Sequence, residues 1–258
     1  MKTLIENPNK IINLNTFTER LNVAKSTISE DVVLVRETLC KLKMGKVETI
    51  SGASGGIRYI IGTDEEESKT FSENLCRILQ DKNRIVPGNY IYMTDVMYNP
   101  QIISRAGRIL ASFFINNVVD YVVTVETKGI PLAYEVANNL GVQLVIARRE
   151  NKVTEGPTVI INYVSGSTGR IQNMSLSKKS LKKGSKCIFI DDFMKGGGTV
   201  HGIIDLLREF DSELLGIGVL VDNVETPKKL IREYVSIIDF SGVNEEGVAL
   251  LNPSKKFE

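Results

Sequence analysis

Residues 187–200 read CIFIDDFMKGGGTV, an apolar run that leads into two aspartates, three glycines and a threonine. The apolar part, Cys187–Ile190, predicts a buried strand that delivers Asp191 and Asp192 to the carboxyl end of a parallel sheet, where α/β proteins bind ligands. Adjacent carboxylates there accept hydrogen bonds from a vicinal diol or hold it together with hydrated Mg²⁺. The stretch therefore indicates a site for a ribose phosphate.

The glycines supply the second part of this site. Gly196, Gly197 and Gly198 lack Cβ, so the backbone there can adopt positive φ and approach an anion closely. Thr199 then opens a helix whose free N–H groups and dipole favour a phosphate. No Gly-Lys-Ser/Thr follows, which excludes a Walker A loop. The alternative is an ordinary turn between a strand and a helix, with exposed aspartates.

The composition narrows the class of protein. The 258 residues are 42% hydrophobic and 24% charged, with a net charge of +1, as in an ordinary soluble globular chain. No apolar run approaches the ~20 residues that span a bilayer, and the N-terminus has no apolar stretch of the kind found in signal peptides. Three distant cysteines and one histidine, His201, predict neither a disulfide framework, nor a zinc site, nor a His-based triad, so a cytoplasmic location is expected.

The first sixty residues form a separate unit. Residues 14–39 carry apolar side chains at helical spacing, interrupted once around residues 22–24. Ser26 is a good helix N-cap, so the pattern predicts a helix-turn-helix. Its second helix begins with small polar residues suited to phosphates and base edges, Lys25, Ser26, Thr27 and Ser29.

A hairpin follows this helix pair. The strands Val47–Ile50 and Ile57–Ile61 bracket a glycine-rich tip, which completes a winged helix with Lys46 and Arg58 as its basic residues. Residues 1–62 hold nine Lys and Arg against six Asp and Glu, so a moderate, salt-sensitive affinity for double-stranded DNA is expected. The alternative is a helix-turn-helix used only for packing or dimerisation.

An acidic linker then separates the two units. Residues 62–68 are polar and lead into a helix, which places the boundary near residue 63, with domains at 1–63 and 64–258. From residue 86 onward strands alternate with helices, as in a largely parallel sheet. The expected fold class is α/β, with a winged helix at the N-terminus.

The 187–200 stretch resembles the phosphoribosyl pyrophosphate (PRPP) motif of type I phosphoribosyltransferases, in which two acids and a small loop follow an apolar strand. A second strand, Val118–Val125, ends in a turn similar to the pyrophosphate loop of that family. The resemblance implies that this turn binds the diphosphate through Thr127, Lys128 and Gly129. Lys195 and Gly196 depart from the enzymes, which have an acid near the first position in one subgroup and usually a threonine at the second.

Residues 166–186 carry one arginine and five lysines without any acid. By the same resemblance they occupy the position of the flexible lid that closes over PRPP. Such a basic lid is expected to contact the ligand, DNA, or each in turn. A solvated basic loop is the alternative.

Longer strings extend the resemblance to the whole chain. They include ETKGIPLAY at 126–134, NKVTEGPTV at 151–159, NYVSGS at 162–167 and MSLSK at 174–178. With the winged helix, they resemble the purine operon repressor family of Gram-positive bacteria. This implies a homodimer that binds operator DNA of purine biosynthesis and transport genes and is released by PRPP, with or without Mg²⁺. It also implies that guanosine tetraphosphate competes for the pocket and favours repression.

The resemblance also assigns the effector site. Asp191 and Asp192 hold the ribose hydroxyls, and Phe193 and Tyr92 are the candidates to face a base. The full expected set is Asp191, Asp192, Phe193, Lys195, Gly196, Gly197, Gly198, Thr199, Thr127, Lys128, Gly129 and Tyr92. No catalytic residue, resident metal or obligatory cofactor is expected.

Two other functions remain open from the sequence. One is a catalytic purine phosphoribosyltransferase with an added regulatory domain, against which Lys195 and Gly196 count. The other is an RNA- or protein-binding module on an inactive enzyme fold, whose winged helix does not touch DNA. Salt-dependent binding to the DNA upstream of its own gene separates this last case from a repressor.

Overall fold

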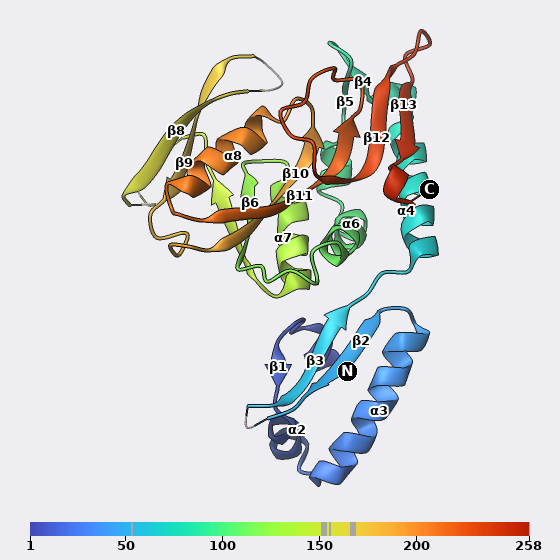
Figure 1. Ribbon diagram of the computed structural model, residues 1–258. Helices are drawn as coiled ribbons and strands as arrows, with labels where there is room; N and C mark the ends of the chain where they lie inside the picture. The colour runs from blue at the N-terminus through green and yellow to red at the C-terminus, as the bar shows by residue number, and fades with distance from the viewer. Residues whose placement is uncertain (53, 151–153, 155, 166–168, 258) are drawn as a thin grey trace.

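The computed structural model describes residues 1–52, 54–150, 154, 156–165 and 169–257 (Figure 1). Residues 1–61 form a small unit that lies below the larger remainder in this view. No helix among the described residues is both long enough and apolar enough to cross a membrane. Cys40, Cys76 and Cys187 are free thiols.

The small unit is the predicted winged helix, which is confirmed. A helix-turn-helix is followed by an antiparallel hairpin, to which a short strand adds in the order β1-β3-β2. Its elements are α1 (Lys2–Ile5), β1 (Ile11–Ile12), α2 (Leu14–Leu21), α3 (Lys25–Lys41), β2 (Gly45–Ile50) and β3 (Gly56–Ile61).

The start of α3 differs from the expectation. The helix begins at Lys25 with Ala24 as its N-cap, and no side chain caps it. Ser26 therefore lies inside the first turn, because Asn22 already reverses the chain in the left-handed conformation with φ of 53°. Of the apolar positions that predicted the helix pair, Leu21 and Val23 are exposed, since they flank this turn rather than face the core.

The larger unit begins with α4, and three residues separate it from the end of β3. Its helices are α4 (Glu65–Leu79), η1 (Lys82–Arg84), α5 (Thr94–Met97), α6 (Pro100–Ser112), α7 (Ile130–Leu140), α8 (Gly198–Arg208) and η3 (Lys255–Phe257). Its strands are β4 (Ile85–Val86), β5 (Tyr90–Ile91), β6 (Tyr121–Val125), β7 (Gln143–Ala147), β8 (Thr158–Val164), β9 (Ile171–Ser177), β10 (Lys186–Met194), β11 (Glu213–Asn223), β12 (Val235–Val243) and β13 (Ala249–Pro253). The boundary near residue 63 stays a prediction.

The central sheet has the order β13-β12-β11-β10-β6-β7 and is parallel except for the pair β12–β13. This confirms the mostly parallel sheet. Alternate residues of β10 enter two layers: Ile188 and Ile190 pack with α4, α6 and α7, whereas Cys187 and Phe189 pack with α8. The sheet is therefore buried on both faces, which explains why its strands read as continuous apolar runs.

The stretch 166–186 is not a single loop. Residues 166–168 lie outside the described residues, but 171–177 form β9, which pairs antiparallel with β8 from Thr158↔Ser177 to Val164↔Ile171. Tyr163 of this hairpin packs against Gly202 of α8, where a Cβ atom would lie 2.9 Å from the ring. Apolar side chains at alternate positions, such as Met174 and Leu176, bury one face of the hairpin and so stabilise strands in this basic stretch.

Candidate functional site

The glycine loop between β10 and α8, predicted to bind a phosphate, lies at the carboxyl end of β10. The strand runs through both aspartates to Met194, further than the predicted Ile190, because Asp191 and Phe193 keep their pairing with β11. The chain then turns at Gly197, with φ of 81°, and α8 begins at Gly198. Thr199 is thus in the first turn rather than at the cap, and the N–H groups of that turn face the loop.

The two adjacent aspartates are both partly buried and interact with each other. The backbone N–H of Asp192 donates to Oδ1 of Asp191 at 2.9 Å. Burial raises the pKa of Asp191 well above its ordinary range, and the negative charge of Asp192 raises it further. Two close, partly buried carboxylates favour a cation or a set of hydroxyl donors beside them.

The loop after β6, residues 126–129, contacts the end of β10 at Asp191. A cis peptide joins Glu126 to Thr127, and α7 starts three residues later. A Cβ atom on Gly129 would lie 2.6 Å from Oδ1 of Asp191, so a larger residue here would displace that carboxylate or the loop. Both strand ends, β6 and β10, therefore bring their loops to one place at the carboxyl edge.

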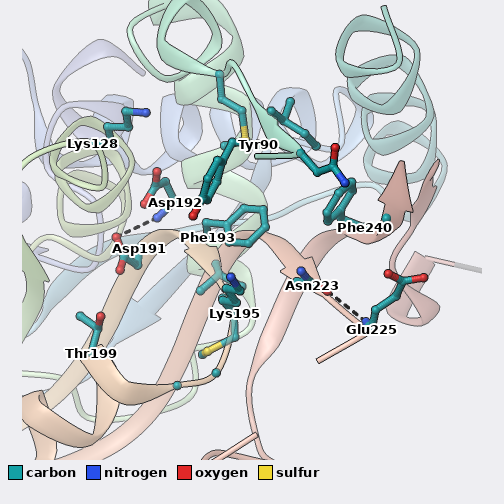
Figure 2. A pocket seen from close by; sticks show the side chains of 18 of the residues that line it. Tyr90, Lys128, Asp191, Asp192, Phe193, Lys195, Thr199, Asn223, Glu225 and Phe240 are labelled. Carbon is teal, nitrogen blue, oxygen red and sulfur yellow. Dashed lines mark hydrogen bonds between the residues drawn. The ribbon is translucent and has the colours of Figure 1, made fainter. Parts of the chain in front are cut away.

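A cavity of about 760 Å³ opens between these loops, and a smaller one of about 380 Å³ adjoins it at the second loop. Figure 2 shows Lys128, Asp191, Asp192 and Thr199 on one side of the larger cavity and the aromatic rings on the other. The two cavities are lined by Asp191, Asp192, Phe193, Lys195, Gly196, Gly197, Gly198, Thr199, Thr127, Lys128 and Tyr92. Every expected effector residue thus lies at this site, since Gly129 abuts Asp191.

The aromatic side contains residues that sequence reasoning missed. Tyr90, on the short β4–β5 hairpin, has its ring centroid 5.9 Å from Nζ of Lys195. Phe240 of β12 lies 6.2 Å from Phe193 between ring centroids. Asn223 also lines the cavity, at the carboxyl end of β11. Its position at a strand end was the available signal, because ligands bind at that edge of parallel sheets.

The segment between β11 and β12 backs the glycine loop. The N–H of Leu230 donates to the carbonyl of Gly196 at 3.0 Å, and Ile231 packs where a side chain on Gly197 would project. This segment is held by Lys229, whose ammonium pairs with the buried carboxylate of Asp222. The shape of the glycine loop therefore depends on the buried Lys229–Asp222 ion pair, which lies outside the cavity.

Cation chemistry at the site is limited by its donors. Among the described residues no group of three or more His, Cys, Asp or Glu is arranged to hold a metal ion. Asp191 and Asp192 alone supply the oxygens that Mg²⁺ prefers, and Mg²⁺ commonly completes its shell with water and ligand phosphates. The donor set thus fits a cation that arrives with its ligand.

None of the five lysines of 178–186 is among the residues that line the two cavities. Lys186 is the first residue of β10, so about 16 Å of strand separates it from Asp191. Lys182 and Lys183 contact residues at the start of β11, through Ser212 and through an ion pair of 2.7 Å with Asp211. They belong to the amino edge of the sheet, so the lid expected beside the phosphates does not contain them.

The expected DNA contacts fall into two groups. Lys25, Ser26, Thr27 and Ser29 are exposed together at the start of α3. Lys46 and Arg58 lie on the hairpin face away from α3, because their neighbours Val47 and Tyr59 are the buried members of the alternation. Both pair with Glu48, at 2.8 Å and 2.9 Å, which offsets their charge.

Family models match a part of each unit. The model described as bacterial purine repressor, N-terminal, matches residues 1–61, and the phosphoribosyl transferase domain model matches residues 94–249.

Two relatives are similar over nearly the whole chain. The purine biosynthesis transcriptional repressor PurR of Bacillus subtilis (strain 168) is 45% identical over 96% of this chain and 88% of its own. The purine biosynthesis transcriptional activator PurR of Lactococcus lactis subsp. lactis (strain IL1403) is 43% identical over 91% of this chain and 87% of its own.

Solved structures agree on the larger unit. Adenine phosphoribosyltransferase from Thermoanaerobacter pseudethanolicus matches with a TM-score of 0.56 at 18% identity, over 65% of this chain and 99% of that one. The enzyme from Saccharomyces cerevisiae matches with a TM-score of 0.55 at 20% identity, over 64% and 97%. At these identities the likeness shows the fold alone.

Proposed function

Because this chain belongs to the PurR family of bacterial purine biosynthesis regulators, we propose that it represses purine biosynthesis and transport genes and is released from operator DNA by PRPP. It is a DNA-binding regulator rather than a transferase, although its larger unit has a phosphoribosyltransferase fold. We place the homodimer in the cytoplasm, where both operator DNA and PRPP are found.

One observation is the main support for PRPP as the effector. Asp191 and Asp192, the glycine loop and the loop at Lys128 surround one cavity at the carboxyl edge. The carboxylates accept the ribose hydroxyls, the first turn of α8 binds the 5′-phosphate, and the loop at Lys128 binds the diphosphate. Where Mg²⁺ accompanies the ligand, the carboxylates of Asp191 and Asp192 would hold it, and it would neutralise part of the charge of the diphosphate.

The aromatic half of the cavity supports a second ligand. PRPP has no base, so the space beside Tyr90, Phe193 and Phe240 stays open when it binds. A guanosine tetraphosphate fills the same polar half with phosphates and places its purine against the rings. Because both ligands need the glycine loop, they compete.

Release follows from linkage. A ligand that binds the DNA-free state more tightly than the DNA-bound state lowers operator affinity by the ratio of those two affinities. High PRPP signals spare precursor, so its binding derepresses synthesis.

The test is fluorescence anisotropy of a labelled operator fragment, titrated with the protein and then with Mg²⁺–PRPP. Asp192→Ala should raise the half-release concentration about 10- to 100-fold, because hydrogen bonds to a charged group are lost. Asp205→Ala, an exposed acid on α8 paired with Arg208, is the matched control and should behave as wild type. Operator binding that PRPP leaves unchanged contradicts PRPP as the effector.

The direction of regulation needs its own assay, since one relative is named as an activator. In transcription with purified polymerase, a repressor lowers transcript from a purine promoter and PRPP restores it. A rise in transcript on adding the protein instead assigns activation. Consumption of PRPP with adenine, guanine, hypoxanthine or xanthine contradicts the assignment as a regulator without catalysis.

A further inference from the structure

Helix α7 joins the effector site to the winged helix. Its first turn follows the loop at Lys128, where the N–H of Ala133 donates to the carbonyl of Gly129 at 2.9 Å. Its eleven residues span about 16 Å. Its last turn ends at Leu140, beside residues 8 and 9 of the small unit (Figure 1). One helix of the larger unit thus starts at the effector site and ends in contact with the small unit.

The contact at the far end is polar and close. The side-chain amide of Asn9 donates to the carbonyl of Leu140 at 2.9 Å. This carbonyl is among the last four of the helix, which have no partner within it. A Cβ atom on Gly141 would lie 2.3 Å from the carbonyl oxygen of Pro8, so the two backbones touch. Asn9 therefore caps α7 from another domain.

Asn9 is also tied into the winged helix. Its φ is 60°, and its backbone N–H donates to the carbonyl of Tyr59, in β3, at 2.8 Å. The hydroxyl of Tyr59 donates to the carbonyl of Met44 at 2.7 Å, just after the end of α3. Hydrogen bonds therefore continue from the end of α7 through the hairpin to the region where α3 ends.

Helix α7 is tightly packed along its length. A Cβ atom on Gly107 of α6 would lie 2.4 Å from Cβ of Glu135, so the two helices cross in close contact. Leu132 and Val136 are fully buried on its inner face. Packed interiors transmit displacement rather than absorb it. A shift of the first turn therefore reaches Leu140.

An ion pair beside the linker is weaker than the Asn9–Leu140 hydrogen bond. Lys43 pairs with Asp64 at 2.6 Å, but the side chain of Lys43 is 57% exposed. Exposed pairs contribute little and move easily. The position of the small unit therefore depends more on the Asn9 cap than on this pair.

We propose that Asn9 is a positioning residue that couples effector binding to operator affinity, by holding the winged helix on the carboxyl-terminal end of α7. The inference rests on the proposed function for the ligand, PRPP. Binding at the loop of residues 126–129 displaces the first turn of α7, and the Asn9–Leu140 contact passes that displacement to β3.

The test compares the operator Kd with and without saturating Mg²⁺–PRPP in the full-length protein. Asn9→Gly removes the amide while tolerating positive φ. Its ratio of the two Kd values should fall about tenfold towards one. PRPP affinity without DNA, measured by calorimetry, should stay at the wild-type value. Asp211→Gly, an exposed residue with φ of 49° outside the junction, is the control and should keep the full ratio.

A second variant keeps the test decisive if Asn9→Gly cannot bind operator. Gly141→Ala pushes on Pro8 from the other side, and it should also lower the ratio without changing PRPP affinity in the absence of DNA. In the wild type, hydrogen exchange of the peptide containing Asn9 should change on adding PRPP alone. A wild-type ratio of one overturns the proposed function. A normal ratio in both Asn9→Gly and Gly141→Ala, beside a responsive wild type, overturns the coupling role.

Discussion

The carboxyl edge of the central sheet carries two backbone loops, two aspartates and aromatic rings around a cavity, whereas the amino edge carries exposed lysines and the contact with residues 1–61. At the first edge, groups from strands far apart in sequence converge on buried or half-buried positions. At the second, charges are mostly in solvent. The ligand site and the contact with the DNA-binding unit therefore lie at opposite ends of the parallel strands, and α7 runs from one end to the other.

The largest expected effect is the loss of stability on breaking the buried Lys229–Asp222 ion pair, which supports the glycine loop at the carboxyl edge. Lys229→Met leaves the carboxylate of Asp222 buried without its partner, which should lower the free energy of unfolding by about 3 kcal/mol. Urea unfolding measures this difference. Lys183→Met breaks the exposed amino-edge pair with Asp211 and should leave the urea midpoint unchanged. Equal losses of unfolding free energy in Lys229→Met and Lys183→Met would show that ion pairs at the two edges contribute equally to stability.

The next effect is on PRPP affinity and comes from the close contact between Gly129, in the loop after β6, and Asp191 at the end of β10. Gly129→Ala places a methyl group 2.6 Å from Oδ1 of Asp191, so the carboxylate or the loop must shift. Overpacking of this kind costs about 1–3 kcal/mol, which should weaken PRPP binding roughly 5- to 150-fold in calorimetry. Gly247→Asn is the control, because it adds a side chain in open space where asparagine tolerates positive φ. Unchanged PRPP binding by Gly129→Ala would show that the loops need not meet.

A smaller effect depends on pH. The pKa of Asp191 is raised in the folded chain by burial and by Asp192, so folding favours its protonated form. That contribution is complete below the ordinary aspartate pKa and is lost as pH rises through the raised one. Asp191→Asn, which keeps an oxygen for the N–H of Asp192, should therefore gain stability relative to wild type as pH rises. Thermal unfolding across this pH range measures the difference, and parallel curves would place Asp191 in an ordinary environment.

The smallest effect is expected in the basic segment that follows β9. The triple change Lys178→Ala, Lys179→Ala and Lys182→Ala should leave the Kd for PRPP within about twofold, because none of these lysines lines the cavities and solution salt screens charges outside them. Calorimetry at physiological salt measures this. A clear loss of PRPP affinity would bring these lysines back to the ligand site.

Much of the site was predictable from local sequence. An apolar run, paired acids and glycines specify a strand, its end and a loop, since each choice depends on neighbours in the chain. The same holds for the second loop at Lys128. The side of the sheet on which residues 178–186 lie was not predictable, because it depends on β9 pairing with β8 and on the start of β10.

The winged helix shows the same division on a smaller scale. Helical spacing and a glycine-rich tip were enough to predict α2, α3 and the hairpin. The face on which Lys46 and Arg58 lie, and their shared partner Glu48, follow from strand register, which a one-residue slip would reverse.

The sequence alone determined the two units, their element types and the residues that surround the polar half of the cavity, because these depend on periodicity, turns and strand ends. Only the tertiary structure decided the aromatic half, the buried Lys229–Asp222 pair and the cap of Asn9 on α7. The physical reason is that these contacts join residues between 7 and 131 positions apart and depend on how packed layers place them, which no local pattern encodes.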